Sequence, residues 1–277
     1  MARPESGRRL IVNADDFGRS RSINQAVIRA HQEGILTTTS LMVNEPGAQD
    51  AVRLARENPK LGVGLHLSLI CGRSALKPTE IPGLTDERYR FSRRPALAGM
   101  RYFLSPRLRS ELRKEIHAQF ERFRLTGLPL DHVNGHLHLH LHPTVFSLLR
   151  HHARKLGIQR FRLTRDPFWL SVRLSPGRWF YRVSHAVVFG CLAWRARGPL
   201  ARLGIRHTDA VFGLLQDGVV DEEYLLRLLP ALPRGDSELY SHPSMNHFKH
   251  ELDALISPRV KDLTRECGIN LIRYQDL

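Results

Sequence analysis

Apolar runs alternate with amphipathic segments along most of the chain, and this alternation constrains the fold more than any other feature. The runs predicted as strands cover residues 10–15, 37–44, 61–69, 161–165, 238–243 and 269–274. The segments with helical periodicity cover residues 22–34, 47–59, 107–127, 144–157 and 250–268. Strands that alternate with helices form parallel sheets with right-handed crossovers. The pattern therefore predicts an α/β fold, an irregular or incomplete (β/α) TIM-like barrel rather than an open sheet.

A length of 277 residues suits one barrel domain, and no internal repeat or low-complexity linker divides the chain. Two segments interrupt the alternation: an irregular, Pro- and Arg-rich loop at residues 71–106, and an Arg/Trp-rich elaboration at about 166–210. We expect one domain over residues 1–277 that carries both segments. We also expect the first helix to begin at Ser22, a residue type that caps helices well, and to end at Gly34.

The charge balance is strongly basic, with 42 Lys and Arg against 27 Asp and Glu, a formal net charge of +15. Such a charge predicts attraction to anionic surfaces such as lipid head groups, nucleic acid or acidic glycans. The three cysteines are widely spaced, which favours a reducing compartment over a disulfide framework. A short basic arm leads directly into the first strand without a signal-peptide pattern, so we expect a cytoplasmic protein. A peripheral position at the inner face of the cytoplasmic membrane stays open.

Residues that can bind a metal ion follow several of the predicted strands. Asp15 and Asp16 end the first run, His66 lies near the end of the third, and a histidine-rich segment covers residues 131–143. In a barrel, the carboxyl ends of the strands meet at one rim, where the chemistry takes place. Two histidines and one carboxylate at such a rim form a common site for a divalent cation. We therefore predict one divalent metal ion, either Zn²⁺ or Mg²⁺.

The histidine-rich segment reads DHVNGHLHLHLHP, and five of the chain's fifteen histidines lie within it. These five share one strand parity, so an extended segment would present all of its imidazoles on one face. Parity does not select the histidine that binds a metal, because a strand rises too quickly for all of them to reach one ion. A chelating surface strand without a buried metal is the alternative.

The adjacent acids at the first strand end permit a division of roles. If the strand has ended and the chain turns at Phe17–Gly18, one carboxylate can bind the cation while its neighbour takes a proton from water. The alternative is an Asp pair that caps the following helix. His242 lies at the end of a later predicted strand, where it could donate a proton to a leaving group. A simple turn residue before Pro243 is the alternative there.

Taken in order, these motifs resemble the YdjC-like carbohydrate deacetylases, the family of chitooligosaccharide deacetylase. The resemblance covers most of the chain and is carried by LIVNADDFG, TTTSLMVN, LGVGLHLSL, IPGLTDE, DHVNGHLHLHLHP, ELYSHP and a terminal YQDL. It implies an irregular barrel with a divalent metal and hydrolytic removal of acetyl from an N-acetylated sugar. Carried over residue by residue, it implies Asp16, His66 and His136 as the metal ligands. It further implies Asp15 as the general base and His242 as the acid.

Three further polar residues near the implied ligands are expected to support them or to contact the substrate: Asn134, His138 and His140. The family commonly has Asp, Ser and His where this chain reads Asn134, Gly135 and His136. An asparagine keeps a hydrogen-bonding side chain but loses a negative charge, so a carboxylate role at this position is lost here. We expect the metal site to survive the change.

The Arg/Trp-rich elaboration departs further from the family pattern. Residues 160–206 contain ten Arg, no Lys and a single acid. We expect Trp179, Arg182, Trp194 and Arg195 to lie on an interfacial helix that touches anionic lipid. A helix packed on the barrel or in a homodimer interface is the alternative. Within the family, this elaboration resembles the branch associated with hopanoid biosynthesis. That branch implies an N-acetylglucosaminyl group on a hopanoid-type lipid as substrate, rather than a soluble chitooligosaccharide.

Two other classes of protein share some of these features. Non-haem Fe(II) oxygenases also use two histidines and one carboxylate, although they commonly present them on an all-β scaffold. A non-catalytic basic module that binds membrane or nucleic acid would explain the net charge. It would leave the adjacent acids and the histidine-rich segment unexplained. We therefore expect a metal-dependent deacetylase with an amino-sugar substrate and no nucleic-acid partner.

Overall fold

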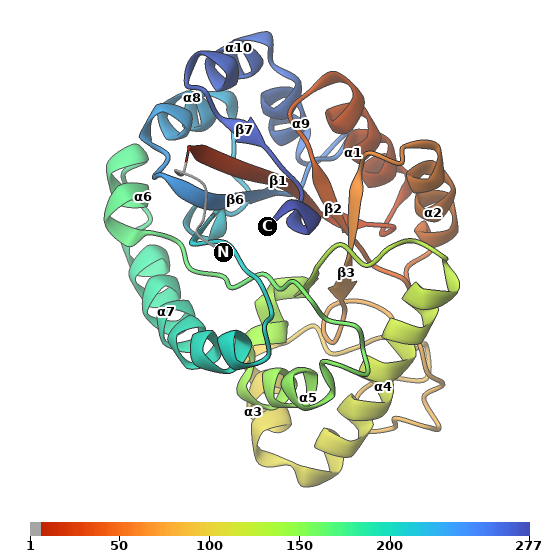
Figure 1. The fold of residues 1–277 in the computed structure, drawn as a ribbon. Coiled ribbons are helices and arrows are strands. Elements are labelled where there is room, and N and C mark those ends of the chain that lie inside the picture. Colours follow the sequence, from red (N-terminus) through yellow and green to blue (C-terminus); the bar gives the residue numbers. More distant parts are fainter. Residues whose placement is uncertain (1–6) are drawn as a thin grey trace.

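The computed structural model describes residues 7–277, so the beginning of the basic N-terminal arm lies outside the described residues. A curled parallel sheet forms the centre of the molecule, and helices pack around its outer side (Figure 1). The strands are β1 (Arg8–Phe17), β2 (Thr38–Leu41), β3 (Gly62–Leu67), β4 (Val133–Gly135), β5 (Ala210–Phe212), β6 (Gly235–Ser241) and β7 (Asn270–Leu271). Their order is β4-β3-β2-β1-β6-β5, and β7 pairs with β1. The predicted incomplete barrel is confirmed.

The predicted helices are present, with differences at their ends, and α3, α6 and α8 are further helices that the alternation did not predict. They are α1 (Arg21–Glu33), α2 (Ala48–Glu57), α3 (Pro95–Leu104), α4 (Pro106–Leu125), α5 (Pro143–His152), α6 (Phe168–Leu174), α7 (Trp179–Arg202), α8 (Glu222–Ala231), α9 (Lys249–Ile256) and α10 (Pro258–Glu266). Helix α1 ends at Gly34 as predicted, but its N-cap is Ser20, whose hydroxyl accepts from the Ile23 amide. The expected cap, Ser22, instead donates its hydroxyl to Asn246.

The barrel stays incomplete because residues 160–165 bridge β4 and β5 without forming a regular strand. Val133 of β4 donates to the Arg160 carbonyl and accepts from the Arg162 amide. On the other side, Phe161 donates to the Arg206 carbonyl. The strand predicted for residues 161–165 is therefore wrong as a regular element. The backbone of this segment hydrogen-bonds to Val133 on one side and to Arg206 on the other. It forms isolated bridges rather than a continuous strand pairing.

Strand β1 lies in the middle of the sheet and separates an apolar layer from a polar interior. Leu10, Val12 and Ala14 are fully buried in the main core cluster that the helices cover. The alternate side chains of Asn13 and Asp15 are buried on the other face, where they hydrogen-bond to each other. The interior of this barrel is therefore a polar network rather than the layers of branched apolar side chains common in TIM barrels.

The segment 71–106 is more ordered than predicted, because helix α3 occupies its last part. Upstream of α3, the buried Glu115 of α4 accepts the backbone amides of Ala75 and Leu76, at 2.7 and 3.0 Å. A buried carboxylate that receives two backbone donors ties this loop to the barrel. The prediction of an irregular loop at residues 71–106 is wrong for its last part, where α3 forms.

The helix predicted near the C-terminus is broken into α9 and α10 at Ser257–Pro258. Ser257 caps α10 through its hydroxyl, and Pro258 occupies the first helical turn. Proline is tolerated there because the amide of that position has no partner within the helix.

The elaboration 166–210 forms the short helix α6 and the long helix α7. Figure 1 shows both on the outer side of the barrel. Helix α7 packs against α5 and against two short 3₁₀ helices, η1 (His136–Leu141) and η2 (Leu214–Gln216). No helix within residues 7–277 is both long enough and apolar enough to cross a bilayer.

Candidate active site

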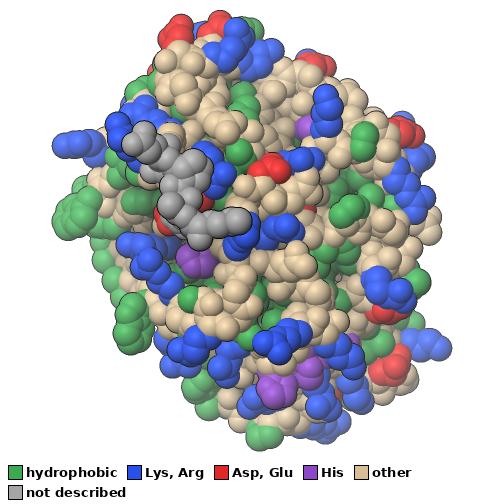
Figure 2. Space-filling view, viewed as in Figure 1, with side chains coloured by type: hydrophobic (Ala, Val, Ile, Leu, Met, Phe, Trp, Pro, Cys, Tyr) green, Lys and Arg blue, Asp and Glu red, His purple; other side chains and the backbone are tan. Residues whose placement is uncertain are grey.

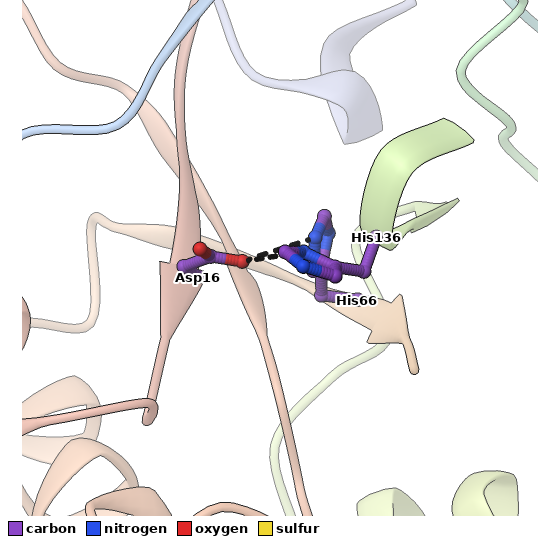
Figure 3. Close-up of side chains that lie close together, drawn as sticks. All are labelled: Asp16, His66 and His136. Atoms are coloured by element: carbon purple, nitrogen blue, oxygen red, sulfur yellow. Dashed lines mark ion pairs between the residues drawn. The ribbon is translucent and has the colours of Figure 1, made fainter. Parts of the chain in front are cut away.

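The three side chains that the resemblance implied as metal ligands lie together at the carboxyl end of the sheet. Asp16 comes from the end of β1, His66 from β3, and His136 is the first residue of η1. Figure 3 shows the three side chains pointing toward one another. All three are buried, and one ligand atom from each lies within 4.8 Å of the others.

The polar atoms of this cluster fit a divalent cation. Asp16 Oδ1 lies 3.4 Å from His66 Nε2 and 3.0 Å from His136 Nδ1. Asp16 Oδ1 and His66 Nε2 are both buried without a hydrogen-bond partner among the described residues. Buried polar atoms nearly always have partners, so two unpartnered acceptor atoms that face each other form a place where a cation can bind. A carboxylate and two imidazoles are the donor set that Zn²⁺ and related ions use.

Asn134 fixes the tautomer of His66. The His66 Nδ1 atom lies 2.8 Å from Asn134 Oδ1, an atom that can only accept. The amide nitrogen of Asn134 donates to Asp15 and to Ser40, which sets the orientation of the amide group. His66 therefore carries its proton on Nδ1 and keeps a lone pair on Nε2, directed at Asp16. Asparagine performs this supporting role without a negative charge.

A β-bulge brings the adjacent acids to the same site. Neighbouring side chains on a regular strand leave on opposite faces. In β1 the pairing register with β2 shifts between Ala14 and Phe17, and Asp16 has the left-handed φ of 66°. His66 is consequently near both carboxylates, 4.0 Å from Asp15 Oδ1 and 3.4 Å from Asp16 Oδ1. The expected end of the strand before Phe17 is wrong, because β1 continues through Phe17 and the bulge turns the side chain.

Asp15 is held by an arginine that the sequence analysis missed. Arg162 donates to both oxygens of Asp15, at 2.7 and 3.0 Å, and Asn13 donates at 2.7 Å. Burial raises the pKa of Asp15, but the charge and hydrogen bonds of Arg162, together with His66 and His242, lower it by more, so the pKa lies well below its usual value. Burial also raises the pKa of Asp16. The neighbouring His136 and His66 lower it by more, so the pKa of Asp16 lies well below its usual value.

Arg162 is fully buried between two carboxylates. Besides Asp15 it binds Glu238 of β6 at 2.7 Å, and Glu238 in turn accepts from the Tyr274 hydroxyl. A charge is buried only where it is paired and hydrogen-bonded. The sequence showed only that Arg162 lies within the predicted strand FRLTR. It did not show which residues the arginine binds.

A cavity of about 690 Å³ opens beside the two acids. Its lining includes Asp15, Asp16, Arg19, Phe91, Phe248 and His242. His242 follows β6 directly, its backbone amide donates to Glu251 at 2.5 Å, and its Nδ1 lies 3.5 Å from Asp217 Oδ1. Burial lowers the pKa of His242, but the carboxylates led by Asp15 and Asp16 raise it above its usual value. The structure thus places His242 at the same cavity as the acids.

The histidine-rich segment is not extended beyond Gly135, so the prediction that its imidazoles share one face is wrong. The backbone enters η1 instead, and Leu137 and His138 have left-handed φ angles of 50° and 55°. This turn allows the chain to enter α5 at Pro143. It directs His136 at Asp16 and sends the other histidines elsewhere.

His138 and His140 are buried behind the site, where they contact residues of its surrounding framework. His138 Nε2 lies 2.9 Å from the Tyr240 hydroxyl, and His140 Nε2 lies 3.0 Å from the Arg162 carbonyl. Burial lowers the pKa of both, to about 3 for His140, so both are neutral. Their contacts hold β6 and the segment that carries Arg162.

Of the four residues expected to contact lipid, three are exposed and one is buried. Trp179, Trp194 and Arg195 are exposed on α7. Arg182 is 1% exposed, and its guanidinium donates to the carbonyl groups of Leu215 and Ser175. The prediction of a lipid contact for Arg182 is wrong, because this turn of α7 faces the carbonyl groups of η2 and of the loop before α7.

Known proteins are similar to this chain in sequence and in fold. A carbohydrate deacetylase from Brevibacillus brevis is 43% identical over 141 residues, which cover 51% of this chain and 54% of that protein. In this match the chain thus spans about half the length of its relative. A chitooligosaccharide deacetylase from Serratia marcescens is 31% identical over 287 residues, 97% of this chain and 98% of that protein.

A solved structure shows the same architecture. A crystal structure of a candidate cellobiose-phosphate cleavage protein from Enterococcus faecalis V583 superposes with a TM-score of 0.76. The alignment covers 98% of this chain and 99% of the other at 23% sequence identity. The sequence profile described as YdjC-like protein matches residues 9–266. The chain therefore belongs to the YdjC-like protein family.

Proposed function

We propose that this chain is a metal-dependent deacetylase that hydrolyses the acetamide bond of an N-acetylated amino sugar. The observation that carries this proposal is the pair of buried, unpartnered ligand atoms on Asp16 and His66, next to an ionised Asp15 and at a cavity of substrate size. The names of the Brevibacillus and Serratia relatives support the same reaction and the same class of substrate.

Asp16 Oδ1, His66 Nε2 and the His136 ring would hold the cation. Two imidazoles favour Zn²⁺ over Mg²⁺, which prefers an all-oxygen shell. When bound, the cation polarises the substrate carbonyl and lowers the pKa of a bound water. The polar residues around the cation would then transfer protons and orient the reacting groups.

Asp15 takes the proton from the attacking water. Arg162 grips the carboxylate with two hydrogen bonds, so its orientation toward the cavity does not vary. The low pKa of Asp15 keeps it ionised throughout the physiological range, and it also makes Asp15 a weak base. Its contribution is therefore chiefly a fixed acceptor position beside the water.

His242 donates a proton to the departing nitrogen. The water oxygen bonds to the acyl carbon, the carbon–nitrogen bond breaks, and the nitrogen leaves as an amine because it receives this proton. The raised pKa of His242 and its nearby Asp217 favour the protonated form before the bond breaks. Acetate and a glucosamine-type amine are the products.

The substrate that we favour is an N-acetylglucosaminyl group on a hopanoid-type lipid. The exposed aromatic side chains of α6 and α7 support a lipid-linked substrate, because they lie on the elaboration that marks this branch of the family. A soluble chitooligosaccharide is the second candidate, favoured by the name of the Serratia relative, which aligns over nearly the whole chain.

Acetate release from both substrates tests the proposal. The zinc-loaded protein is expected to release acetate, to lose this activity with a chelator, and to regain it when Zn²⁺ is restored. Faster release from the lipid-linked sugar supports the hopanoid assignment, and faster release from chitooligosaccharide overturns that assignment alone. No acetate from either substrate would contradict the deacetylase itself.

A further inference from the structure

Helix α7 carries an exposed apolar stripe that no side chain within residues 7–277 covers. Phe180 is 90% exposed and Trp194 is 80% exposed, with Val183 and Val187 also exposed between them. Their spacing of three, four and seven residues places them on one side of the helix. Large apolar side chains that gather on a surface mark an interaction site, whereas scattered ones do not.

Helix α6 extends this surface. The α6–α7 patch consists of Trp169, Trp179, Phe180, Val183, Val187, Val188 and Trp194, all of them exposed. It contains all three tryptophans of the chain, and Trp169 is 81% exposed. Figure 2 shows apolar side chains projecting from the left edge, where Figure 1 places α6 and α7, with Lys and Arg side chains beside them.

The charged side chains that α6, α7 and the loop between them carry are all positive. Arg173, Arg178, Arg195 and Arg197 are exposed on or next to its two helices. No Asp or Glu occurs in residues 167–208. Tryptophan at the rim of an apolar surface, with arginine beside it, suits the head-group region of a bilayer, where an indole ring meets both apolar and polar surroundings.

We propose that the α6–α7 patch docks on the surface of an anionic lipid bilayer. The apolar stripe would lie among the acyl chains near the head groups, and the arginines would bind the lipid phosphates. A second copy of this chain is a poorer occupant, because a pair of patches would bring arginine against arginine between two molecules that each carry a formal charge of +15.

The inner side of α7 connects this surface to the candidate active site. The Phe189 ring lies 5.3 Å from the His138 ring, and the Tyr181 hydroxyl donates to the Leu214 carbonyl of η2. A docked molecule would therefore have the helix that packs on His138, behind the candidate site, next to the membrane. The docking does not depend on the proposed deacetylation, and the test below measures no activity.

Vesicle binding of the full chain tests the proposal. We expect co-sedimentation with vesicles that contain phosphatidylglycerol in phosphatidylcholine, much less with phosphatidylcholine alone, and weaker binding at high salt. Because all tryptophans lie in the patch, their emission should shift to shorter wavelength when anionic vesicles are added. Each substitution Phe180→Ser, Val187→Ser or Trp194→Ser should weaken binding about tenfold.

Matched variants keep the test decisive. Leu125→Ser, at an exposed position of α4 outside the patch, should bind vesicles as the parent chain does. The double charge reversal Arg195→Glu with Arg197→Glu should abolish the preference for anionic vesicles. Unchanged vesicle binding by a variant that combines Phe180→Ser, Val187→Ser and Trp194→Ser, or no binding by the parent chain, would overturn the proposal. A dimer in analytical ultracentrifugation with short-wavelength emission before any vesicle is added would overturn it as well.

Discussion

Asp15 and Asp16 are neighbours in the chain, but they meet different partners. Asp15 is enclosed by Arg162, Asn13 and Asn134, which satisfy both of its oxygens. One oxygen of Asp16 binds Arg19, while its Oδ1 faces the two imidazoles without a donor. A carboxylate that is already satisfied has little affinity left for a cation, whereas an unpartnered oxygen retains it. This difference assigns proton transfer to Asp15 and cation binding to Asp16 in our proposal.

Replacing Asp15 by asparagine should separate the two roles. Asp15→Asn is expected to retain bound zinc and to lose acetate release by about 10²–10⁴-fold, the usual contribution of a positioned base. Metal content by mass spectrometry and initial rates check this outcome. His66→Ala is the matched variant that should lose the metal. A metal-free Asp15→Asn protein, or a fully loaded and active His66→Ala protein, would contradict the division of roles.

Removing Arg162 should destabilise the fold. Arg162→Met leaves Asp15 and Glu238 buried without their cation, and breaking a buried ion pair in this way costs about 3–5 kcal/mol. Urea unfolding monitored by circular dichroism measures the free energy of unfolding. Arg273→Met, which removes a partly exposed ion pair with Asp276, is the control and should cost less than about 1 kcal/mol. Equal losses in the two variants would show that Arg162 is not the electrostatic centre of the barrel.

At the scale of elements, the site depends on two departures from regular secondary structure. The bulge in β1 redirects Asp16, and the left-handed turn of η1 separates His136 from the histidines that follow. Residues other than glycine adopt a left-handed backbone at a cost of about 1–2 kcal/mol. The surrounding packing holds this strain where the site requires it.

Leu137 offers a direct measure of that strain, since it is about half exposed and has a φ of 50°. Leu137→Gly and Leu137→Ala both delete the side chain, but glycine also relieves the strain. We expect the glycine variant to be more stable by about 1 kcal/mol in urea unfolding. Met100 in α3 should show the reverse order, with alanine more stable than glycine by about 1 kcal/mol. The same order at both positions would contradict a strained η1.

At the scale of the whole molecule, the basic surface surrounds a barrel interior in which carboxylates and cations balance each other. Glu238, Arg162 and Asp15 form a continuous buried chain across the sheet. The excess positive charge lies outside this network, and part of it flanks the α6–α7 patch. The charge that organises the site is thus separate from the charge that favours an anionic surface.

One buried acid outside that network should make the stability depend on pH. Burial raises the pKa of Asp166 to about 6, although Ser171 and the Leu215 amide donate to it. The folded pKa exceeds the unfolded value of 3.8, so this stabilisation is complete below pH about 4 and is lost as the pH rises through about 6. The loss amounts to about 3 kcal/mol. Urea unfolding at several pH values should show this change in the parent chain relative to Asp166→Asn. A difference between the two that does not vary with pH would contradict it.

Local patterns in the sequence predicted the elements well. The alternation of strands and helices, the position of Gly34 at the end of α1 and the incomplete barrel follow from hydrophobic periodicity, which depends on neighbouring residues. The same local reasoning missed α3, β5 and α8, and it read the histidine-rich segment as a strand. The alternation of histidine and leucine has the period of a strand, and the left-handed backbone of Leu137 and His138 that interrupts it leaves no mark in that pattern.

The sequence by itself determined the order of the elements and the residue types at the strand ends, because both are properties of short stretches of chain. Tertiary structure alone decided that Arg162 binds Asp15, since the two lie 147 residues apart. It also decided which histidine faces Asp16, because a bulge and a left-handed turn set the direction of those side chains. Pairing and direction depend on where the backbone is held by the rest of the barrel, and no local pattern contains that information.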